Sequence, residues 1–126
     1  MTREGGCAPF ESRDGRILYY LRGCQGAALL ARPTGGGNER TIVQCVDAWN
    51  YTVGPQGVFH VDCTPPGVPS SQRILRLWDA ATGQDRPVAT IEGAWVAGLS
   101  ASPDGRTVLW GRSTLASDLV MIENFR

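Results

Sequence analysis

The stretch that decides the fold reads Leu99-Ser100-Ala101-Ser102-Pro103-Asp104-Gly105-Arg106, and the apolar run Val108-Leu109-Trp110 follows it. An Asp-Gly turn between two short apolar segments is among the strongest short-range signals for a β-hairpin. A similar stretch near the start reads Phe10-Glu11-Ser12-Arg13-Asp14-Gly15-Arg16, before Ile17-Leu18-Tyr19-Tyr20. A weaker copy between them reads Tyr51-Thr52-Val53-Gly54-Pro55-Gln56-Gly57, before Val58-Phe59-His60-Val61. The chain therefore contains three hairpins of one design.

These hairpins recur at a regular distance along the 126 residues. The glycines that close their turns, Gly15, Gly57 and Gly105, are 42 and 48 residues apart. A period of about 40 to 50 residues is typical of the four-stranded blades of a β-propeller. Apolar residues alternate with a period of two and turn residues recur, so no helix is predicted.

We therefore expect an all-β fold of about three four-stranded antiparallel blades, a half propeller, in a single domain over 1–126. The blades are expected at about 7–46, 49–92 and 97–123, and the last one lacks its outer strand, which makes eleven strands. The outer strand of the first blade (39–46) and the inner strand of the second (49–53) are expected to be separate. Pro87 falls in an expected outer strand, where proline is tolerated because one edge is unpaired.

Charge and hydropathy exclude several classes of function. Lys and Arg number 12, as do Asp and Glu, so the formal net charge is zero. No basic stripe is present, and we expect no nucleic-acid binding by this segment because such binding depends on phosphate neutralisation. No apolar run is long enough to span a membrane, and we expect no signal peptide, because the first residues contain no apolar segment. If the chain is complete, we expect a soluble, cytoplasmic protein without a membrane partner; otherwise the compartment is open.

The four cysteines, Cys7, Cys24, Cys45 and Cys63, are unevenly spaced and form no C-x-x-C pair. Zinc ligands usually come as such pairs, and a chain of this size does not need a disulfide framework. We expect four free thiols that pack as small apolar residues. In His60-Val61-Asp62-Cys63, alternation places His60 and Asp62 on one strand face, but we expect no metal and no cofactor there.

No catalytic constellation is present in the sequence. The G-x-S-x-G pattern of a nucleophile elbow is absent, and the single histidine, His60, has no serine beside it. We expect Asp14, Gly15, Asp104 and Gly105 to be structural turn residues, because aspartate hydrogen-bonds its own turn backbone. A binding surface, if one exists, is expected at the inner-strand ends and turns, at these residues: Trp49, Trp95, Arg13, Arg16 and Arg106.

The Ser102-Pro103-Asp104-Gly105-Arg106 turn resembles the repeats of TolB-like propellers, also called WD40-like or PD40 repeats. The segment 75–79, followed by Thr82-Gly83, is similar to the strand end of a WD40 blade. Over the whole chain, the sequence resembles the carboxyl-terminal part of bacterial proteins in which such a propeller follows a winged-helix DNA-binding domain or a Ser/Thr kinase domain. The resemblance implies a sensory or scaffolding module, and it identifies no ligand.

The propellers of that family have six or more blades, and this chain has about three. An incomplete ring leaves two apolar blade faces and at least one strand edge open. We therefore expect a non-catalytic module for binding an unknown protein or small ligand, with the ring completed by a second copy in a six-bladed homodimer. The alternatives are a fragment of the sensory propeller of a regulator or kinase, and a hydrolase-type propeller enzyme.

Overall fold

The computed structural model describes residues 7–23, 27–63, 72–92, 96–112 and 118–123. Every regular element in these residues is a strand, and no helix there is long and apolar enough to cross a membrane. The strands of the described residues are β1 (Cys7–Glu11), β2 (Ile17–Leu21), β3 (Ala27–Pro33), β4 (Arg40–Val53), β5 (Gly57–Asp62), β6 (Gln72–Asp79), β7 (Asp85–Glu92), β8 (Val96–Ala101), β9 (Thr107–Arg112) and β10 (Asp118–Glu123).

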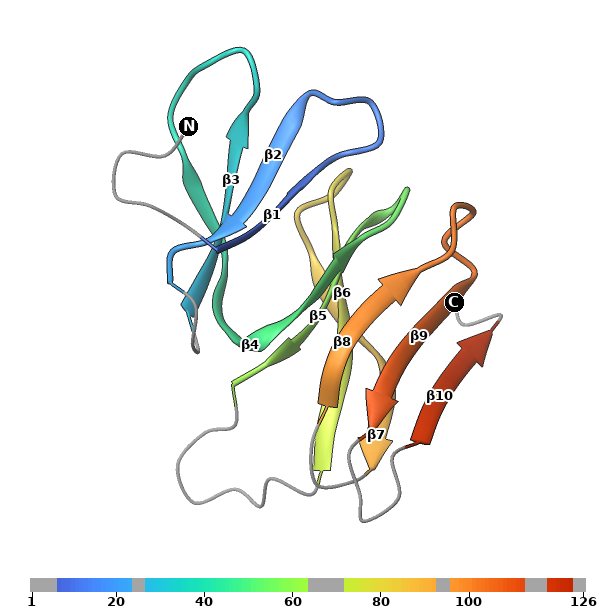
Figure 1. Cartoon of the computed structure of the whole chain (residues 1–126). Coiled ribbons are helices and arrows are strands. Elements are labelled where there is room, and N and C mark those ends of the chain that lie inside the picture. Colours follow the sequence, from blue (N-terminus) through green and yellow to red (C-terminus); the bar gives the residue numbers. More distant parts are fainter. Residues whose placement is uncertain (1–6, 24–26, 64–71, 93–95, 113–117, 124–126) are drawn as a thin grey trace.

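The strands form two sheets, and within each sheet every strand pairs antiparallel with its neighbour along the chain. The first sheet has the order β1 to β7, and the second has the order β10-β9-β8. Figure 1 shows three groups of strands side by side in chain order. We refer to β1–β3 with the first part of β4 as blade 1, to the last part of β4 with β5–β7 as blade 2, and to β8–β10 as blade 3.

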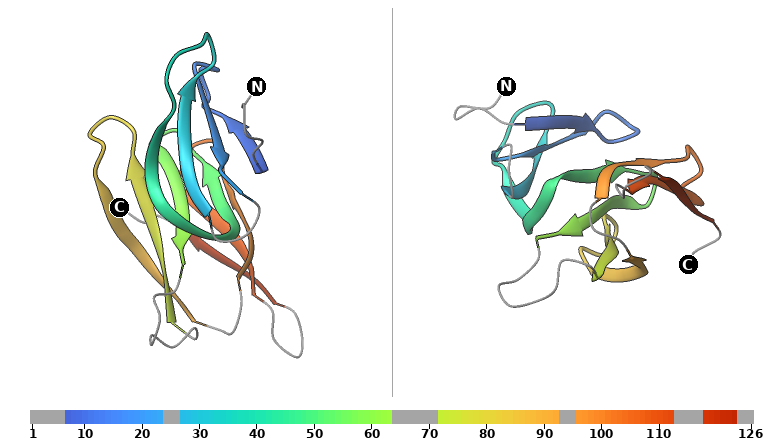
Figure 2. Two further views of the ribbon diagram at one scale, coloured as in Figure 1. Left: turned by 90° about the vertical axis from the view of Figure 1, so that its left-hand side faces the viewer. Right: turned by 60° about the horizontal axis from the view of Figure 1, so that its bottom comes forward.

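The strand β4 belongs to two blades. Its first part pairs with β3, where Val43 lies opposite Leu29, and its last part pairs with β5, where Tyr51 lies opposite His60. The expectation of separate strands at 39–46 and 49–53 was therefore wrong, and the described residues contain ten strands rather than eleven. No glycine or proline interrupts residues 47–50, so the extended backbone continues. A register shift between Val46 and Tyr51 accompanies the change of partner, and Figure 2 shows β4 curving.

Two apolar clusters hold the blades together. In each blade, alternate side chains point to opposite faces of the sheet, so a central blade can pack on both sides. In β5, Val58 faces blade 1, whereas Phe59 and Val61 face blade 3. The cluster between blades 1 and 2 contains Tyr19, Leu21, Leu29, Ala31, Val43, Val46, Tyr51, Val58 and Trp78. The cluster between blades 2 and 3 contains Phe59, Val61, Leu75, Leu77, Ile91, Val108 and Trp110.

The architecture is that of an all-β partial propeller. Successive antiparallel sheets pack face to face, as propeller blades do. In blade 2, β7 is the outermost strand, and the exposed Pro87 lies there, where β6 is its only partner strand in the described residues. Blade 3 has three strands in the described part of the chain. The exact limits of a domain over 1–126 and of blades at 7–46, 49–92 and 97–123 stay predictions.

The outer face of blade 1 differs from the expected bare apolar surface. Tyr20 and Leu30 point away from blade 2, since they alternate with residues of the first cluster, yet each is only 2% exposed. The Tyr20 hydroxyl donates a hydrogen bond to the Glu39 carboxylate, which also pairs with Arg22. The outer face of blade 1 therefore contains polar and charged groups as well as apolar ones. Among the described residues, the exposed large apolar side chains are Phe10 and Ile74.

The cysteines also differ from expectation, because none of those in the described residues is a free thiol. Cys45 and Cys63 form a disulfide between β4 and the end of β5. Val46 lies opposite Asp62 in this antiparallel pair, which brings the flanking cysteines to a Cα–Cα separation of 5.4 Å. Cys7 is disulfide-bonded as well, and Cys24 lies outside the described residues. The prediction of free thiols failed because the register of β4 on β5 was not known.

Candidate functional site

The first and third hairpin turns have the same hydrogen-bond pattern. In the first, Asp14 Oδ1 accepts from the Ser12 hydroxyl (2.6 Å) and from the Arg16 backbone nitrogen (3.0 Å). In the third, Asp104 accepts from Ser102 and Arg106 at the same two distances. The serine hydroxyl, followed by the backbone nitrogen, holds the pKa of both carboxyls below the usual 3.8. Both aspartates are therefore ionised turn residues that remain exposed to solvent.

The second turn is built differently. Its sequence is Gly54-Pro55-Gln56-Gly57, so it lacks the serine and the aspartate of the other two turns. It closes when the Gly54 nitrogen donates to the Gly57 carbonyl (2.8 Å). Among the described residues, the Gln56 side chain makes no hydrogen bond to its own turn, unlike Asp14. Instead, its Nε2 donates to the carbonyl of Gly105 in the third turn (2.9 Å).

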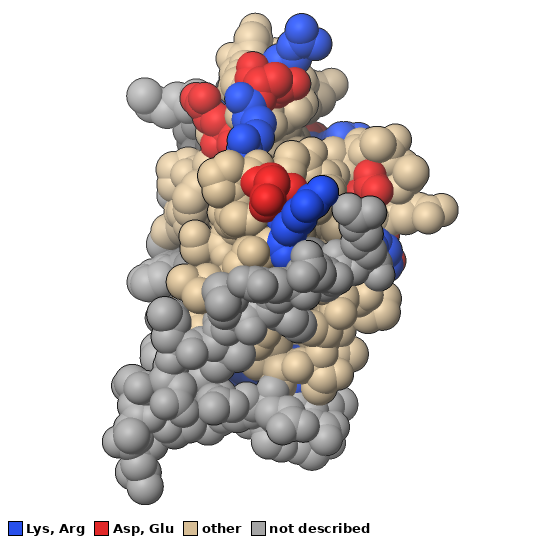
Figure 3. Space-filling model, turned by 90° about the vertical axis from the view of Figure 1, so that its right-hand side faces the viewer, with Lys and Arg blue, Asp and Glu red and all other residues tan. Residues whose placement is uncertain are grey.

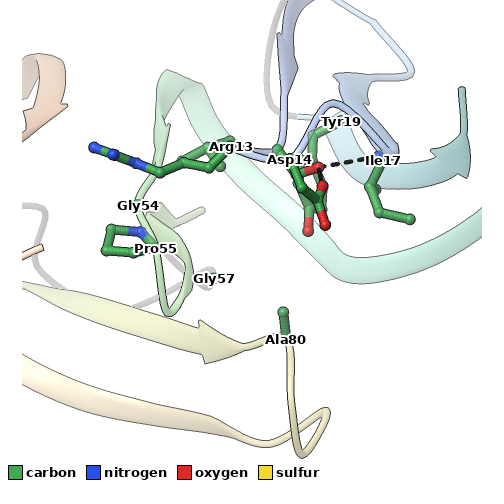
Figure 4. Close-up of a pocket in the computed structure, with 10 residues that line it drawn as sticks. Arg13, Asp14, Ile17, Tyr19, Gly54, Pro55, Gly57 and Ala80 are labelled. Carbon is green, nitrogen blue, oxygen red and sulfur yellow. Dashed lines mark hydrogen bonds between the residues drawn. The ribbon is translucent and has the colours of Figure 1, made fainter. Parts of the chain in front are cut away.

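A pocket of about 230 Å³ lies between the first and second turns. Figure 4 shows the Asp14 side chain directed into the gap above Ala80, whereas Arg13 extends along the opposite side, over Gly54 and Pro55. The Asp14 carboxylate thus faces the pocket, whereas the Arg13 side chain runs past Gly54 and its guanidinium points away from Asp14. The pocket is lined by Ser12, Arg13, Asp14, Ile17, Tyr19, Val53, Gly54, Pro55, Gly57 and Ala80.

Of the binding residues expected from the sequence, Arg13 lines this pocket, and so does Asp14, which was expected to be a structural turn residue. Arg16 lies on the same turn and contributes its backbone nitrogen. Arg106 is exposed on the third turn and does not line the pocket. Trp49 lies in β4, but its side chain is not described, and Trp95 lies outside the described residues. The pocket thus includes one residue of the expected binding surface, Arg13, and the predictions for the two tryptophans stay predictions.

Sequence analysis missed the apolar side of the pocket. Tyr19 and Val53 belong to strands of different blades, and Ala80 follows the end of β6. Their sequence spacing carries no signal of a shared site, because the packing of blade 1 on blade 2 is what brings them together. Only the position of Arg13 and Asp14 in a turn pointed toward this region.

His60 forms a second polar cluster, within blade 2. It is fully buried, with Nδ1 2.5 Å from the Asp62 carboxylate and Nε2 2.9 Å from the Asp85 carboxylate. The other oxygen of Asp85 accepts a hydrogen bond from Arg76 Nε (2.8 Å). Since both ring nitrogens face carboxylate oxygens, the imidazole links β5 to β7 and has no lone pair directed toward a substrate. No metal-binding group of three or more His, Cys, Asp or Glu occurs in the described residues.

Charges are mixed on the surface. Figure 3, which views the molecule from the right-hand side of Figure 1, shows acidic and basic side chains next to one another between uncharged residues. Within the described residues, ion pairs also join Arg22 to Glu39 and Arg73 to Asp47. The described part of this face therefore offers no field of a single sign for a highly charged partner.

Comparison with known proteins supports the fold and leaves the family open. No protein-family model matches the chain, and no curated protein matches it. Among solved structures, the chain is similar to a prolyl endopeptidase, an enzyme with a β-propeller domain, studied for the role of inter-domain dynamics in catalysis and specificity. The TM-score is 0.60 at 15% sequence identity, over 92% of this chain and 20% of that enzyme. The chain thus spans one fifth of the enzyme's length, and the similarity shows the propeller-like fold alone.

Proposed function

We propose that this chain is a non-catalytic β-propeller module that binds a protein or small ligand at the end where its hairpin turns meet. The observation that carries the proposal is the pocket between the turns of blades 1 and 2, where the Asp14 carboxylate faces a largely apolar lining. Concave sites with a few polar groups on an apolar lining are typical of ligand binding. Turns held on a rigid sheet scaffold are also common positions for binding residues.

The candidate acid and base side chains make hydrogen bonds within the protein, which supports a binding role rather than a catalytic one. Asp14 and Asp104 hold their own turns, and His60 lies buried between two carboxylates. A general base or a nucleophile activator needs a lone pair that can reach the substrate. Both ring nitrogens of His60 face carboxylate oxygens, and each aspartate holds its own turn through Oδ1. We therefore assign no catalytic role to these three residues.

We further propose that a second copy completes the ring, as a homodimer of two three-bladed halves. Ring closure removes the open blade faces and strand edges of an incomplete propeller. Blade 3 has three strands in the described residues, whereas blade 2 has four. A strand of a second copy can therefore pair with the edge of β10. Light scattering on a sizing column tests this proposal. We expect twice the chain mass of 13.6 kDa; a monomer at micromolar concentration contradicts ring closure by a second copy.

A second candidate follows from the structural similarity. The chain covers only 20% of the matched enzyme, so the module can be one part of a longer protein with further blades and another domain. A sensory propeller behind a DNA-binding or kinase domain is the form that the sequence resemblance implies. Sequencing the gene upstream and downstream of this segment, in the same reading frame, distinguishes a free-standing module from a part of a longer protein. A chromogenic prolyl peptide tests the hydrolase alternative, and we expect no turnover by this chain.

The disulfides indicate the kind of cellular compartment in which the protein is found. Structural disulfides persist in oxidising environments and are rare in the cytosol. The bond between Cys45 and Cys63 and the bonded state of Cys7 therefore favour an oxidising compartment over the cytoplasm. Mass spectrometry of the natural protein after rapid alkylation tests this proposal. Modification of Cys45 and Cys63 without prior reduction would contradict it.

A further inference from the structure

The Asp14 carboxylate uses only one of its oxygens to hold the first turn. Oδ1 accepts from the Ser12 hydroxyl (2.6 Å) and from the Arg16 backbone nitrogen (3.0 Å), whereas no hydrogen bond within the described residues uses Oδ2. These two hydrogen bonds lower the pKa of Asp14, so the group is ionised at neutral pH. Figure 4 shows the carboxylate facing the pocket. The pocket therefore contains a negative charge with one open acceptor oxygen.

The guanidinium groups of the same turn leave this oxygen open. The Arg13 side chain runs past Gly54, and its guanidinium points away from Asp14. Arg16 contributes its backbone nitrogen and does not line the pocket. Within the described residues, neither arginine forms an ion pair with Asp14. The carboxylate can thus accept a hydrogen bond from a cation that comes from outside the chain.

The walls of the pocket are mainly apolar. Ile17 and Tyr19 contribute from blade 1, and Val53 contributes from blade 2. The Ser12 hydroxyl is already engaged, since it donates to Asp14 and accepts from the Ile17 backbone nitrogen (3.0 Å). An anion would be repelled by Asp14, and a hydrogen bond from a neutral donor is weaker than one from a cation. The lining therefore suits a ligand with an alkyl stem and a cationic end.

The single open oxygen distinguishes between the two common kinds of organic cation. A guanidinium pairs best with a carboxylate through two parallel hydrogen bonds, one to each oxygen. At Asp14 this geometry is blocked, because Oδ1 already accepts the two bonds of the turn. An ammonium is a compact point charge that can donate to one oxygen alone. The turn geometry thus favours an ammonium over a guanidinium.

We propose that the pocket between blades 1 and 2 binds a primary alkylammonium group, whose nitrogen donates to Asp14 Oδ2 and whose methylenes pack on Ile17, Tyr19 and Val53. The proposal rests on the proposed binding function and names its ligand chemistry. A lysine side chain of a partner protein and a small free amine both carry this group. The pocket volume of about 230 Å³ suits one alkyl chain, since it is below the roughly 300–1,000 Å³ of sites that enclose a drug-sized ligand.

The test is an NMR titration of the ¹⁵N-labelled chain with n-butylammonium at low ionic strength, because salt screens exposed charges. We expect saturable shifts of the amides of Gly54, Gly57 and Ala80, with a dissociation constant on the order of millimolar, since so small a ligand supplies little binding energy. Three controls have the same alkyl chain: n-butanol, n-butylguanidinium and pentanoate. All three should bind more weakly than n-butylammonium, and equal or tighter binding of any of them overturns the proposal.

Two aspartates provide a matched pair of variants. Asp14→Asn and Asp104→Asn make the same change in turns with the same hydrogen bonds, and asparagine is well accepted in turns. Of the two, Asp14 lines the pocket and Asp104 does not. We expect Asp14→Asn to weaken n-butylammonium binding about tenfold, because the hydrogen bond to a charged group is lost. Asp104→Asn should leave the affinity unchanged, and equal effects of the two variants contradict the proposal.

A third variant separates binding in the pocket from pairing with Asp14 in open solvent. Ala80 is exposed and lies below the Asp14 side chain, so Ala80→Leu fills the space between them while the charge is retained. This variant should also weaken n-butylammonium binding. An affinity unchanged by Ala80→Leu would show that the amine pairs with the carboxylate outside the pocket, and it would overturn the proposal.

The two sources of the ammonium group are distinguished with N-acetyl-lysine methylamide. Binding at least as tight as that of n-butylammonium supports a lysine of a partner protein, and weaker binding supports a small free amine. Failure of the ligand chemistry and failure of the proposed function also look different. If another of the probes binds best, the pocket is a binding site for a different class of ligand. If no probe shifts the three amides, the proposed function loses the observation that carries it.

Discussion

The Gln56 side chain joins blade 2 to blade 3 by donating a hydrogen bond from Nε2 to the carbonyl oxygen of Gly105, at a distance of 2.9 Å. The two residues are 49 positions apart in the chain. Gly105 has a φ of +71°, and a Cβ at this residue would overlap the glutamine carboxamide. Gly15 has the same φ of +71° in the first turn, where the nearest atom to such a Cβ is Glu11 Oε2 at 3.8 Å. The two glycines thus differ in their surroundings and share their backbone conformation.

Gly105→Ala should destabilise the protein more than Gly15→Ala. Both variants place a side chain in the left-handed region, at a cost of about 1–2 kcal/mol. Gly105→Ala should lose roughly 1 kcal/mol more, because the Gln56 hydrogen bond must break. Urea unfolding of the two variants measures the difference. In the Gln56→Ala background the two glycine substitutions should cost the same, and an unchanged difference there would show that Gln56 is not its cause.

Removal of the Cys45–Cys63 disulfide should lower the free energy of unfolding by about 3 kcal/mol, since the bond closes a loop in the unfolded chain. The two cysteines are 18 positions apart. The double variant Cys45→Ala, Cys63→Ala is preferable to a reducing agent, which also acts on the disulfide of Cys7. Denaturant unfolding of the parent and the variant measures the loss. Equal midpoints would contradict a stabilising role for this bond.

Stability should decrease in alkaline solution partly because of Tyr20. Burial, followed by the hydrogen bond to Glu39, raises the pKa of Tyr20 from 10.0 to about 12. The folded state therefore retains a proton that the unfolded chain releases above about pH 10, so this contribution to stability is complete below pH 10 and is lost as the pH rises toward 12. Tyr20→Phe should flatten the dependence of the urea midpoint on pH in this range. The same slope in parent and variant would contradict the assignment.

Asp104→Ala should lower the melting temperature by a few degrees, because the Ser102 hydroxyl and the Arg106 nitrogen lose their shared acceptor. The pKa of Asp104 is lowered from 3.8, so its contribution to stability is present above that pH and is lost as the pH falls through the lowered pKa. The variant should therefore lose less stability than the parent on acidification below about pH 4. Asp104→Asn retains an acceptor oxygen and serves as the control. A melting temperature unchanged by Asp104→Ala would contradict a structural role for this turn.

The sequence predicted the all-β class because the responsible signals are local. An Asp-Gly pair between alternating apolar segments specifies a hairpin from about ten consecutive residues. The turn bonds of Asp14 reach only to Ser12 and Arg16, within two positions on each side. The period of 42 and 48 residues indicated propeller blades, which the curled antiparallel strands and the structural similarity support at the level of the fold.

The disulfide, the continuity of β4 and the polar cluster of His60 depended on register instead. Alternation placed His60 and Asp62 on one face, but the contact with Asp85 needed the pairing of β5, β6 and β7. A shift of one residue in any of these pairs would turn the side chains to the opposite face. The sequence pattern leaves that register open where several alignments keep apolar residues inside.

The amino-acid sequence by itself determined where the chain turns and which strand faces are apolar, since backbone sterics, aspartate side chains and alternation act over a few residues. Only the tertiary structure decided which blades meet at which turns. It brought Gln56 to Gly105, left a pocket between Asp14 and Gly57, and paired Cys45 with Cys63. The physical reason is that these contacts join residues far apart in the chain, and only the register of the strands and the face-to-face packing of the blades sets their distances.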